Sequence, residues 1–272
     1  MLLYKYQKAK WGKAVLRKLQ LKMTPPNEFN DPFEFTPATR NPIESLDSHN
    51  LAKLNTWLHK KGLGISSIES LRKVLPVLVK NNPRARDFAL GLVRADMASL
   101  NRASKHFGVL CLAESAADIR MWAHYGDNHR GIVVGLDFDY EVSGIDGVLS
   151  FGKVRYRKKR CLLEPTLPGG KAFHNQMVKI TMTKSRTWRD EREHRMVVRL
   201  QDIQGKQSNS KAFSHFLRVR PQTIREVVMG CCISEADNRA IQNLIKAKLP
   251  HVRLSKLSRH VTEFEMVHVS VR

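Results

Sequence analysis

Two glutamates in the last third of the chain have the spacing of a catalytic carboxylate pair. Trp188, Glu191, Glu193 and Arg195 form the pattern W-x-x-E-x-E-x-R. If a strand begins near Glu191, alternate side chains share one face, so both carboxylates and the guanidinium point the same way. Such a pair could accept hydrogen bonds from sugar hydroxyls or stabilise an oxocarbenium-like cation. We therefore predict Glu191 and Glu193 as catalytic residues and Trp188 and Arg195 as ligand contacts, with an ion-paired strand edge as the alternative.

A second group of candidate residues lies in segment 121–131, just before an apolar run. His124 could act as a general acid or base because imidazole titrates near neutral pH. Trp122 and Tyr125 offer faces on which a nucleobase or a nicotinamide ring could stack. Two histidines five residues apart, His124 and His129, make a weak metal site, so no metal is predicted. Each histidine alone is typical of a structural group. The cluster as a whole predicts a pocket in which His124 is catalytic and the other three side chains bind ligand.

A third group is the turn 30–34, Asn-Asp-Pro-Phe-Glu. Pro32 keeps the preceding residue out of the helical region, which leaves the Asn30 and Asp31 side chains able to bond backbone or a ligand. We predict that both residues bind ligand, and that the turn lies against segment 121–131 with Asp31 orienting one of its histidines. The alternative is a capped turn that bonds only its own backbone.

The charge of the chain points to an anionic partner. Lys and Arg number 47 against 25 acidic residues, a formal net charge of +22 in 272 residues. Such a surface attracts nucleic acid by counterion release. The excess is spread over 5–22, 155–160, 184–199 and 246–259, and no known DNA- or RNA-binding signature is present. Nucleic acid is therefore a plausible partner, and a generally basic protein is the alternative.

Several classes of protein are excluded by missing patterns. The sequence has no G-x-G-x-x-G loop, P-loop, H-E-x-x-H or G-x-S-x-G motif. No apolar run reaches the roughly 18 residues of a membrane span, and Lys5 comes too early for a signal peptide. The four cysteines fit no zinc motif and predict reduced thiols. We expect a cytoplasmic protein with no membrane partner.

The predicted elements place these groups in one α+β domain over residues 1–272 with a mixed or antiparallel central sheet. Apolar spacings of three and four predict a helical insertion at 43–104, with breaks at 62–64 and 81–83. A further helix is expected at 116–125 with Ser115 as its cap. Other helices are predicted at 10–19, 171–184 and 234–248, and strands at 2–6, 19–23, 107–112, 131–139, 148–156, 193–200, 224–230, 252–257 and 263–269.

Taken in order, these motifs resemble those of a bacterial family of unknown function, number 2971 in that series. The resemblance runs from residue 2 to about residue 247, and segment 43–104 lies outside it. It rests on 3–6 with Tyr4 and Tyr6, on 29–34, on 121–131, and on Trp188, Glu191, Glu193 and Arg195. The family supplies no settled activity, but the resemblance makes Tyr4 and Tyr6 candidate ligand contacts.

A looser, fold-level similarity is to ADP-ribosyltransferases, in which a late glutamate stabilises the cation formed as nicotinamide leaves NAD. Here Glu191 or Glu193 would take that glutamate's place, and Tyr4, His124 or Tyr125 would hold the ring. No residue matches the first or second member of the known triads. The similarity implies an enzyme acting on a nucleotide or nucleic acid, such as a toxin or defence factor, with NAD as a candidate substrate. The alternative is a non-catalytic module that binds nucleic acid or a small ligand.

Overall fold

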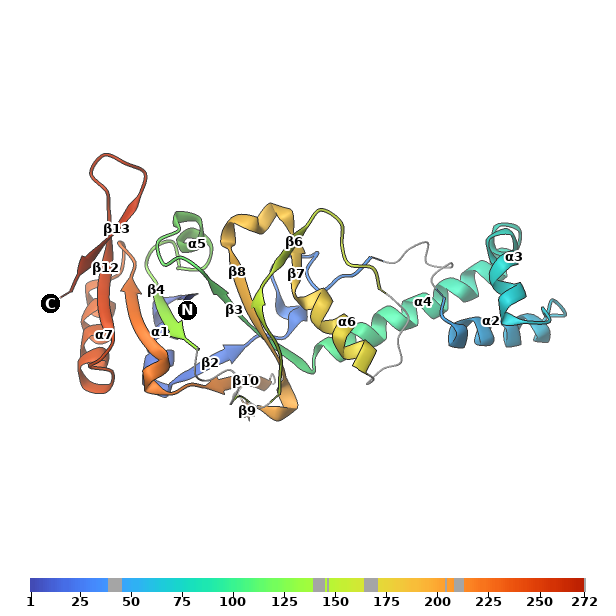
Figure 1. Ribbon diagram of the computed structural model, residues 1–272, viewed down its shortest axis with the longest axis horizontal. Helices are drawn as coiled ribbons and strands as arrows, with labels where there is room; N and C mark the ends of the chain where they lie inside the picture. Colours follow the sequence, from blue (N-terminus) through green and yellow to red (C-terminus); the bar gives the residue numbers. More distant parts are fainter. Residues whose placement is uncertain are drawn as a thin grey trace. The chain divides into compact units, whose positions relative to one another are not determined.

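The computed structural model describes residues 1–38, 46–138, 145, 147–163, 171–203, 205–207 and 213–271. The chain forms two compact units (Figure 1). Unit 1 comprises Met1–Pro25, Phe107–Tyr156 and Arg186–Arg272, and unit 2 comprises Pro26–His106 and Arg157–Ser185. The prediction of a single domain over 1–272 stays a prediction.

Unit 1 is built on an eight-stranded sheet. All neighbouring strands are antiparallel except β11 and β12, which are parallel. The predicted α+β class with a mixed, mostly antiparallel sheet is therefore confirmed. In spatial order the strands are β13 (Met266–Ser270), β12 (Arg253–Arg259), β11 (Ile224–Met229), β4 (Ile132–Asp137), β1 (Leu2–Gln7), β3 (Phe107–Ala113), β8 (Glu193–Arg199) and β5 (Val148–Lys153).

The core of unit 1 lies on one face of this sheet. Alternate residues of each strand, such as Leu110 and Leu112 on β3, point into it because side chains in a strand alternate between faces. Helices α1 (Ala9–Lys18) and α7 (Glu235–Lys248) contact each other and contribute apolar residues to this core. Ser234 caps α7 as predicted, since its Oγ accepts a hydrogen bond from the Asp237 backbone N–H at 3.1 Å.

Strands outside the main sheet are short. β2 (Gln20–Met23), β10 (Phe213–Arg218) and β9 (Gly205–Gln207) form a three-stranded sheet in unit 1. The sequence analysis predicted only the first of these. The predicted strand 148–156 is divided into β5 and β6 (Arg155–Arg157).

Unit 2 contains the three amphipathic helices predicted at 43–104, of which residues 43–45 lie outside the described part of the chain. They are α2 (Ser48–Lys60), α3 (Ile68–Asn81) and α4 (Pro83–Ser104). Each begins with a side-chain cap, from Asp47, Ser67 and Asn82 in turn. Their apolar stripes, including Leu54, Leu58, Leu71 and Leu75, bury one another in a separate core. The remaining elements of unit 2 are η1 (Pro26–Glu28), α6 (Lys171–Thr181) and β7 (Thr183–Ser185).

Two predicted boundaries near the candidate site were wrong. The helix expected at 116–125 with Ser115 as its cap is α5 (Ile119–His124), and Asp118 caps it instead. The Asp118 carboxylate accepts the backbone N–H groups of Arg120 and Met121 at 2.9 and 3.1 Å. A carboxylate is a strong cap because it also complements the positive end of the helix dipole.

The strand predicted to begin near Glu191 begins two residues later, at Glu193. Glu191 ends the short helix η3 (Arg186–Glu191), and Arg192 has a φ of 45°. The left-handed backbone at Arg192 interrupts the extended conformation between η3 and β8, so no continuous strand connects the two glutamates.

No helix in the ranges described above combines the length and the apolar character that crossing a membrane would require.

Candidate functional site

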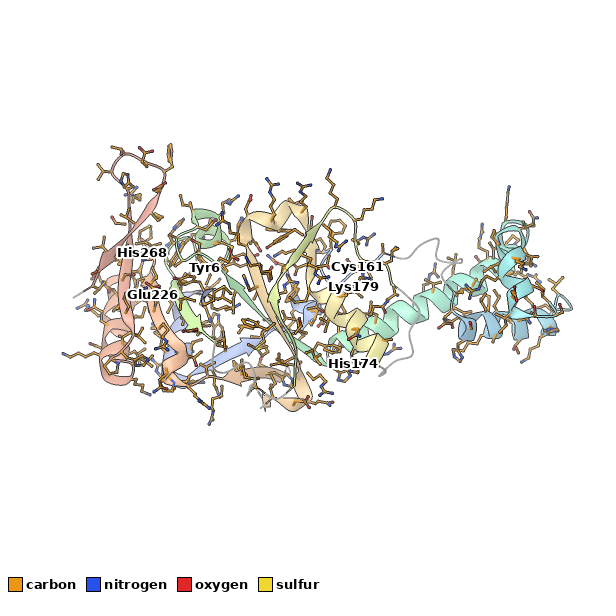
Figure 2. The ribbon with its side chains drawn as sticks, in the orientation of Figure 1. Tyr6, Cys161, His174, Lys179, Glu226 and His268 are labelled. Atoms are coloured by element: carbon orange, nitrogen blue, oxygen red, sulfur yellow. The ribbon has the colours of Figure 1, made fainter. Side chains whose placement is uncertain are left out.

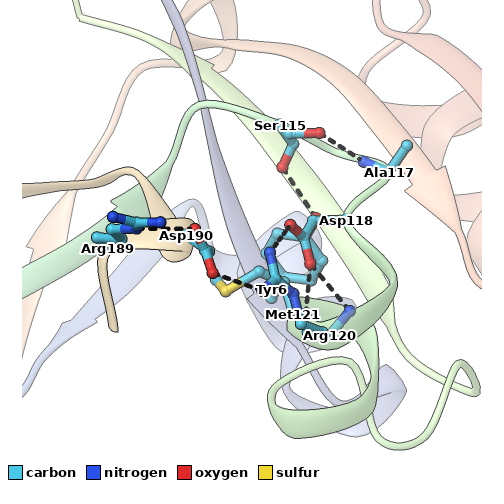
Figure 3. Close-up of polar contacts among 8 residues, drawn as sticks. All are labelled: Tyr6, Ser115, Ala117, Asp118, Arg120, Met121, Arg189 and Asp190. Atoms are coloured by element: carbon cyan, nitrogen blue, oxygen red, sulfur yellow. Dashed lines mark hydrogen bonds and ion pairs between the residues drawn. The ribbon is translucent and has the colours of Figure 1, made fainter. Parts of the chain in front are cut away.

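Two segments distant in sequence, α5 and η3, are joined by ion pairs in unit 1 (Figure 3). The Arg120 guanidinium donates to Asp190 Oδ2 at 2.7 Å and lies 3.5 Å from Asp118 Oδ2. Arg189 Nε lies 3.7 Å from the other Asp190 oxygen. The hydrogen bond from Arg120 holds the pKa of Asp190 below its ordinary value. Acidic and basic side chains therefore alternate in a row of ion pairs, and these pairs connect the C-terminal part of η3 to the start of α5.

The predicted residues of both segments meet next to these ion pairs. Tyr125 Oη donates a hydrogen bond to Glu191 Oε1 at 3.0 Å. The rings of His124 and Trp188 lie edge to face, with centroids 6.3 Å apart. The expectation that segments 121–131 and 188–195 come together thus agrees with the structure at these four side chains.

Three of these side chains, His124, Trp188 and Glu191, line one or both of two cavities in unit 1. The larger, of about 520 Å³, lies among the loop before α5, the end of η3 and the tip of the β12–β13 hairpin. The smaller, of about 170 Å³, has His124, Trp188 and Thr187 in its wall. Both are lined by Asp118, Arg120, Met121, Asp190 and Glu191. Of the two glutamates predicted as catalytic, Glu191 is the one that lines these cavities.

Glu193 and Arg195 have a different environment from Glu191. They lie two residues apart on β8 and pair through two hydrogen bonds, of 2.6 Å from Nε and 3.0 Å from Nη2. Their side chains are 5% and 1% exposed, and neither lines the two cavities. The prediction that Glu191 shares a face with this pair was wrong, because Glu191 precedes the strand. The ion-paired strand described as the alternative fits Glu193 and Arg195, and the ligand contact predicted for Arg195 stays a prediction.

Trp122, predicted as a stacking surface, is a core residue. Its side chain is fully buried, its indole N–H donates to the Ala116 carbonyl at 2.8 Å, and Tyr6 contacts it edge to face. Two glycines pack against the indole, and neither position has room for a Cβ. One added at Gly126 would lie 2.4 Å from the Trp122 ring, and one at Gly230 would lie 2.9 Å from it. We therefore leave Trp122 out of the proposed site.

His129 lies at the end of a left-handed turn. Asp127, Asn128 and His129 have φ values of 56°, 51° and 63°, a conformation that costs about 1–2 kcal/mol per residue for side chains other than glycine. The His129 ring stacks on Trp122 with an interplanar angle of 12°, and burial lowers its pKa. His129 therefore contacts the buried indole, and it is not among the residues that line the two cavities.

The two tyrosines of β1 pack on the face of the sheet opposite Leu3 and the main core. Tyr6 Oη donates to the Ser115 carbonyl at 2.9 Å. Tyr4 Oη donates to the buried Glu226 at 3.1 Å, and Arg253 donates to the other Glu226 oxygen at 3.0 Å. Burial, with the nearby Glu226, raises the pKa of Tyr4 to about 12. Both tyrosines are thus tied into hydrogen bonds that support the sheet.

The turn with Asn30 and Asp31 belongs to unit 2, whereas segment 121–131 belongs to unit 1. Asp31 is buried, and its Oδ1 accepts the backbone N–H of Phe33 at 2.9 Å. Glu34 pairs with Lys184 at 3.2 Å. The prediction that this turn helps to shape the cleft with the histidines stays a prediction.

Sequence reasoning missed the residues that join α5 to η3. Asp118, Arg120 and Asp190 were not proposed as site residues, although Asp118 stands where a helix cap is expected. Phe264 and Glu265 in the larger cavity were also missed, because nothing in the sequence indicates that a hairpin tip turns toward α5. Within the described ranges, no three His, Cys, Asp or Glu side chains are grouped as a metal ion would require.

Comparison with known proteins identifies one segment of the chain. Residues 121–196 match the model of a family described as "Protein of unknown function (DUF2971)". That segment is similar to this family. The matched segment contains most of α5, Trp188 and the Glu193–Arg195 pair, and it confirms the resemblance to this family over residues 121–196. No curated protein and no solved structure matches the chain.

Proposed function

We propose that the cavities beside α5 and η3 bind a nucleotide and that the protein cleaves or transfers at its glycosidic carbon, with NAD as the candidate substrate. The observation that carries this proposal is the position of Glu191. Its carboxylate lines both cavities and accepts a hydrogen bond from Tyr125 at 3.0 Å. A fixed carboxylate beside a cavity suits the stabilisation of positive charge that develops on a sugar ring.

The neighbouring side chains provide what a nucleotide substrate needs. Trp188 and His124 present ring faces and edges in the smaller cavity, where a nicotinamide or adenine ring would stack. Arg120 and Arg192 line the larger cavity, where they would attract a pyrophosphate. Arg195, predicted as a ligand contact, lines neither cavity, so we assign the phosphate contacts to Arg120 and Arg192.

The proposed reaction breaks the bond between the ribose C1′ and the nicotinamide nitrogen. The bonding electrons leave with nicotinamide, which becomes neutral, and Glu191 stabilises the cation left at C1′. Water or a hydroxyl acceptor then forms the new bond at C1′ and gives its proton to the imidazole of His124, which acts as the general base. Glu193 is left out of these steps because its two oxygens are committed to Arg195 in a buried pair.

The experiment that tests this proposal measures nicotinamide release from NAD by the purified chain, and ADP-ribose binding by calorimetry. Glu191→Gln should abolish release while ADP-ribose still binds, because the amide keeps the shape of the side chain but loses its charge. Glu69→Gln is the matched control, since Glu69 is an exposed carboxylate on α3. Equal release by the wild type and Glu191→Gln, or the absence of both release and binding, would refute the proposal.

A further inference from the structure

A cavity in unit 2, separate from the proposed nucleotide cavities, has a strongly basic lining. Its volume is about 720 Å³, within the range of ligand sites. One wall is segment 157–160, Arg-Lys-Lys-Arg, and a second is formed by Phe33 and residues 35–38. Lys184 adds a fifth cation, and no acidic side chain is among the described residues that line the cavity. Every charged side chain in this lining is a cation, so the lining attracts anions.

The four cations of segment 157–160 are available to a ligand. All four side chains are exposed, and in the described part of the chain no carboxylate pairs with any of them. Lys184 differs, because it is buried and its charge is balanced by Glu34 at 3.2 Å. The uncompensated charge of this cavity is thus concentrated on the exposed wall.

An exposed aromatic ring faces these cations. Phe33 is 62% exposed, and the guanidinium of Arg160 lies 5.9 Å from its ring centroid. Exposed phenylalanines are unfavourable in water, and this one lies beside a cation where a planar ring could stack. It therefore has the position of a stacking platform and not that of a core residue.

The turn that carries Phe33 holds the ring outward. Asp31 Oδ1 accepts the Phe33 backbone N–H at 2.9 Å, and Thr36 Oγ1 donates to the Phe33 carbonyl at 2.7 Å. Phe35, two residues later, is buried with a φ of 56°. The motif at 30–35 thus buries Phe35 and exposes Phe33 to solvent. We assign to this motif the positioning of the Phe33 ring, a role that the family resemblance does not imply.

Backbone hydrogen bonds fix the two walls relative to each other. The Ala38 N–H donates to the Cys161 carbonyl at 2.7 Å, and the Leu163 N–H donates to the Ala38 carbonyl at 2.8 Å. At the base of the cavity, Cys161 Sγ lies 3.2 Å from Thr183 Oγ1, and Figure 2 marks this cysteine near Lys179 of α6. The ring and the cations are therefore preorganised within unit 2.

We propose that this cavity binds single-stranded nucleic acid, with a base stacked on Phe33 and the flanking phosphates held by segment 157–160. A ring beside a row of cations is the combination that binds unpaired strands without sequence preference. A duplex keeps its bases stacked inside and has none to place in the cavity. An acidic peptide would use the cations but not the ring. This site is independent of the proposed reaction at Glu191.

The test is fluorescence anisotropy of the full chain with a labelled 12-nucleotide oligouridylate. Lys158→Gln/Lys159→Gln should weaken binding about tenfold at 50 mM salt. It should also reduce the slope of log affinity against log salt by about 1.4, or about 0.7 for each lost phosphate contact. The matched control is Lys60→Gln/Lys61→Gln, an exposed lysine pair at the end of α2 in the same unit. It should bind within about twofold of the wild type.

A second pair of variants separates the ring from the charge. Phe33→Ala should weaken binding at least fivefold, a loss of about 1 kcal/mol by the usual strength of base stacking, with an unchanged salt slope. Val77→Ala is the control, because Val77 is equally exposed at 62% in the same unit. Thermal melting of each variant verifies that unit 2 is folded, and Glu191→Gln should bind the oligonucleotide like the wild type.

Several results would overturn the inference. They are an absence of binding, an equal loss in the Lys60/Lys61 control, and a Phe33→Ala variant that binds like the wild type. Equal affinity for a 12-base-pair duplex, or for an oligoglutamate of matched charge, would also overturn it. Uridine monophosphate that binds as tightly as the oligonucleotide would also contradict it, since a mononucleotide contacts too few of the four cations.

Discussion

Replacing Glu193 with glutamine should destabilise unit 1 severely, whereas the same change at Glu191 should not. The Glu193 and Arg195 side chains are 5% and 1% exposed and share two hydrogen bonds. Loss of the carboxylate charge leaves the buried guanidinium without its compensating partner. Breaking a buried pair from one side costs about 3–5 kcal/mol.

The size of this effect can be followed by melting. In a chain of this length each kcal/mol shifts the melting temperature by about 2–4 °C, so Glu193→Gln should lower it by at least about 6 °C. Glu191 is half-buried and loses part of one hydrogen bond to Tyr125, which is worth about 1 kcal/mol. Circular dichroism during heating, with chemical denaturation as a second readout, measures both variants against the wild type.

A double variant controls for general intolerance at these positions. Glu193→Leu/Arg195→Met removes both charges and fills similar volume, and it should recover most of the stability that Glu193→Gln loses. The reasoning would be refuted if Glu193→Gln melted with the wild type, or if Glu191→Gln destabilised the protein as much. Either result would mean that the division into a structural and a cavity-facing glutamate is wrong.

Three further predictions follow from the contacts in unit 1. Tyr125→Phe should lower the rate of nicotinamide release more than it raises KM, because it removes the hydrogen bond to Glu191 Oε1 but keeps the ring. Steady-state kinetics measure kcat and KM separately, and an effect on KM alone would contradict this role. Burial lowers the pKa of both His129 and His194, so these residues bind protons more weakly in the folded state than in the unfolded state. The stability of the protein should be full above about pH 6.5 and should fall as the pH drops through the folded pKa values. The decline in melting temperature should be smaller in His129→Asn, because asparagine tolerates the left-handed backbone at this position. Gly230→Ala should lower the free energy of unfolding by about 2 kcal/mol or more, because its Cβ would lie 2.1 Å from the His129 carbonyl oxygen. The control is Gly91→Ala on α4, whose Cβ meets nothing within 4 Å, and it should be neutral or stabilising in urea unfolding.

The sequence predicted the elements of the fold better than it predicted their boundaries at the site. Regular apolar spacing located the helices of unit 2 and most strands of the large sheet, because burial imposes those periods directly. It could not place the start of β8, which depends on a left-handed residue at Arg192. A difference of two residues there separates Glu191 from Glu193 and changes which of them can meet a ligand.

The roles of the aromatic residues were harder to predict for a related reason. Trp122 and Trp188 stand in similar polar surroundings in the sequence, yet one is fully buried and the other lines a cavity. The difference arises from close packing against glycines distant in sequence, such as Gly230. Likewise, the pairing of Arg120 with Asp190 joins residues 70 positions apart, and no local pattern indicates it.

The measurement that tests the central claim most directly is a crystal structure of the full chain soaked with ADP-ribose. The account predicts density in the two cavities beside α5 and η3, with a ribose hydroxyl within hydrogen-bond distance of a Glu191 oxygen and the diphosphate toward Arg120 and Arg192. Cavities that stay empty at a saturating ligand concentration, or a ligand bound elsewhere with Glu191 untouched, would contradict it.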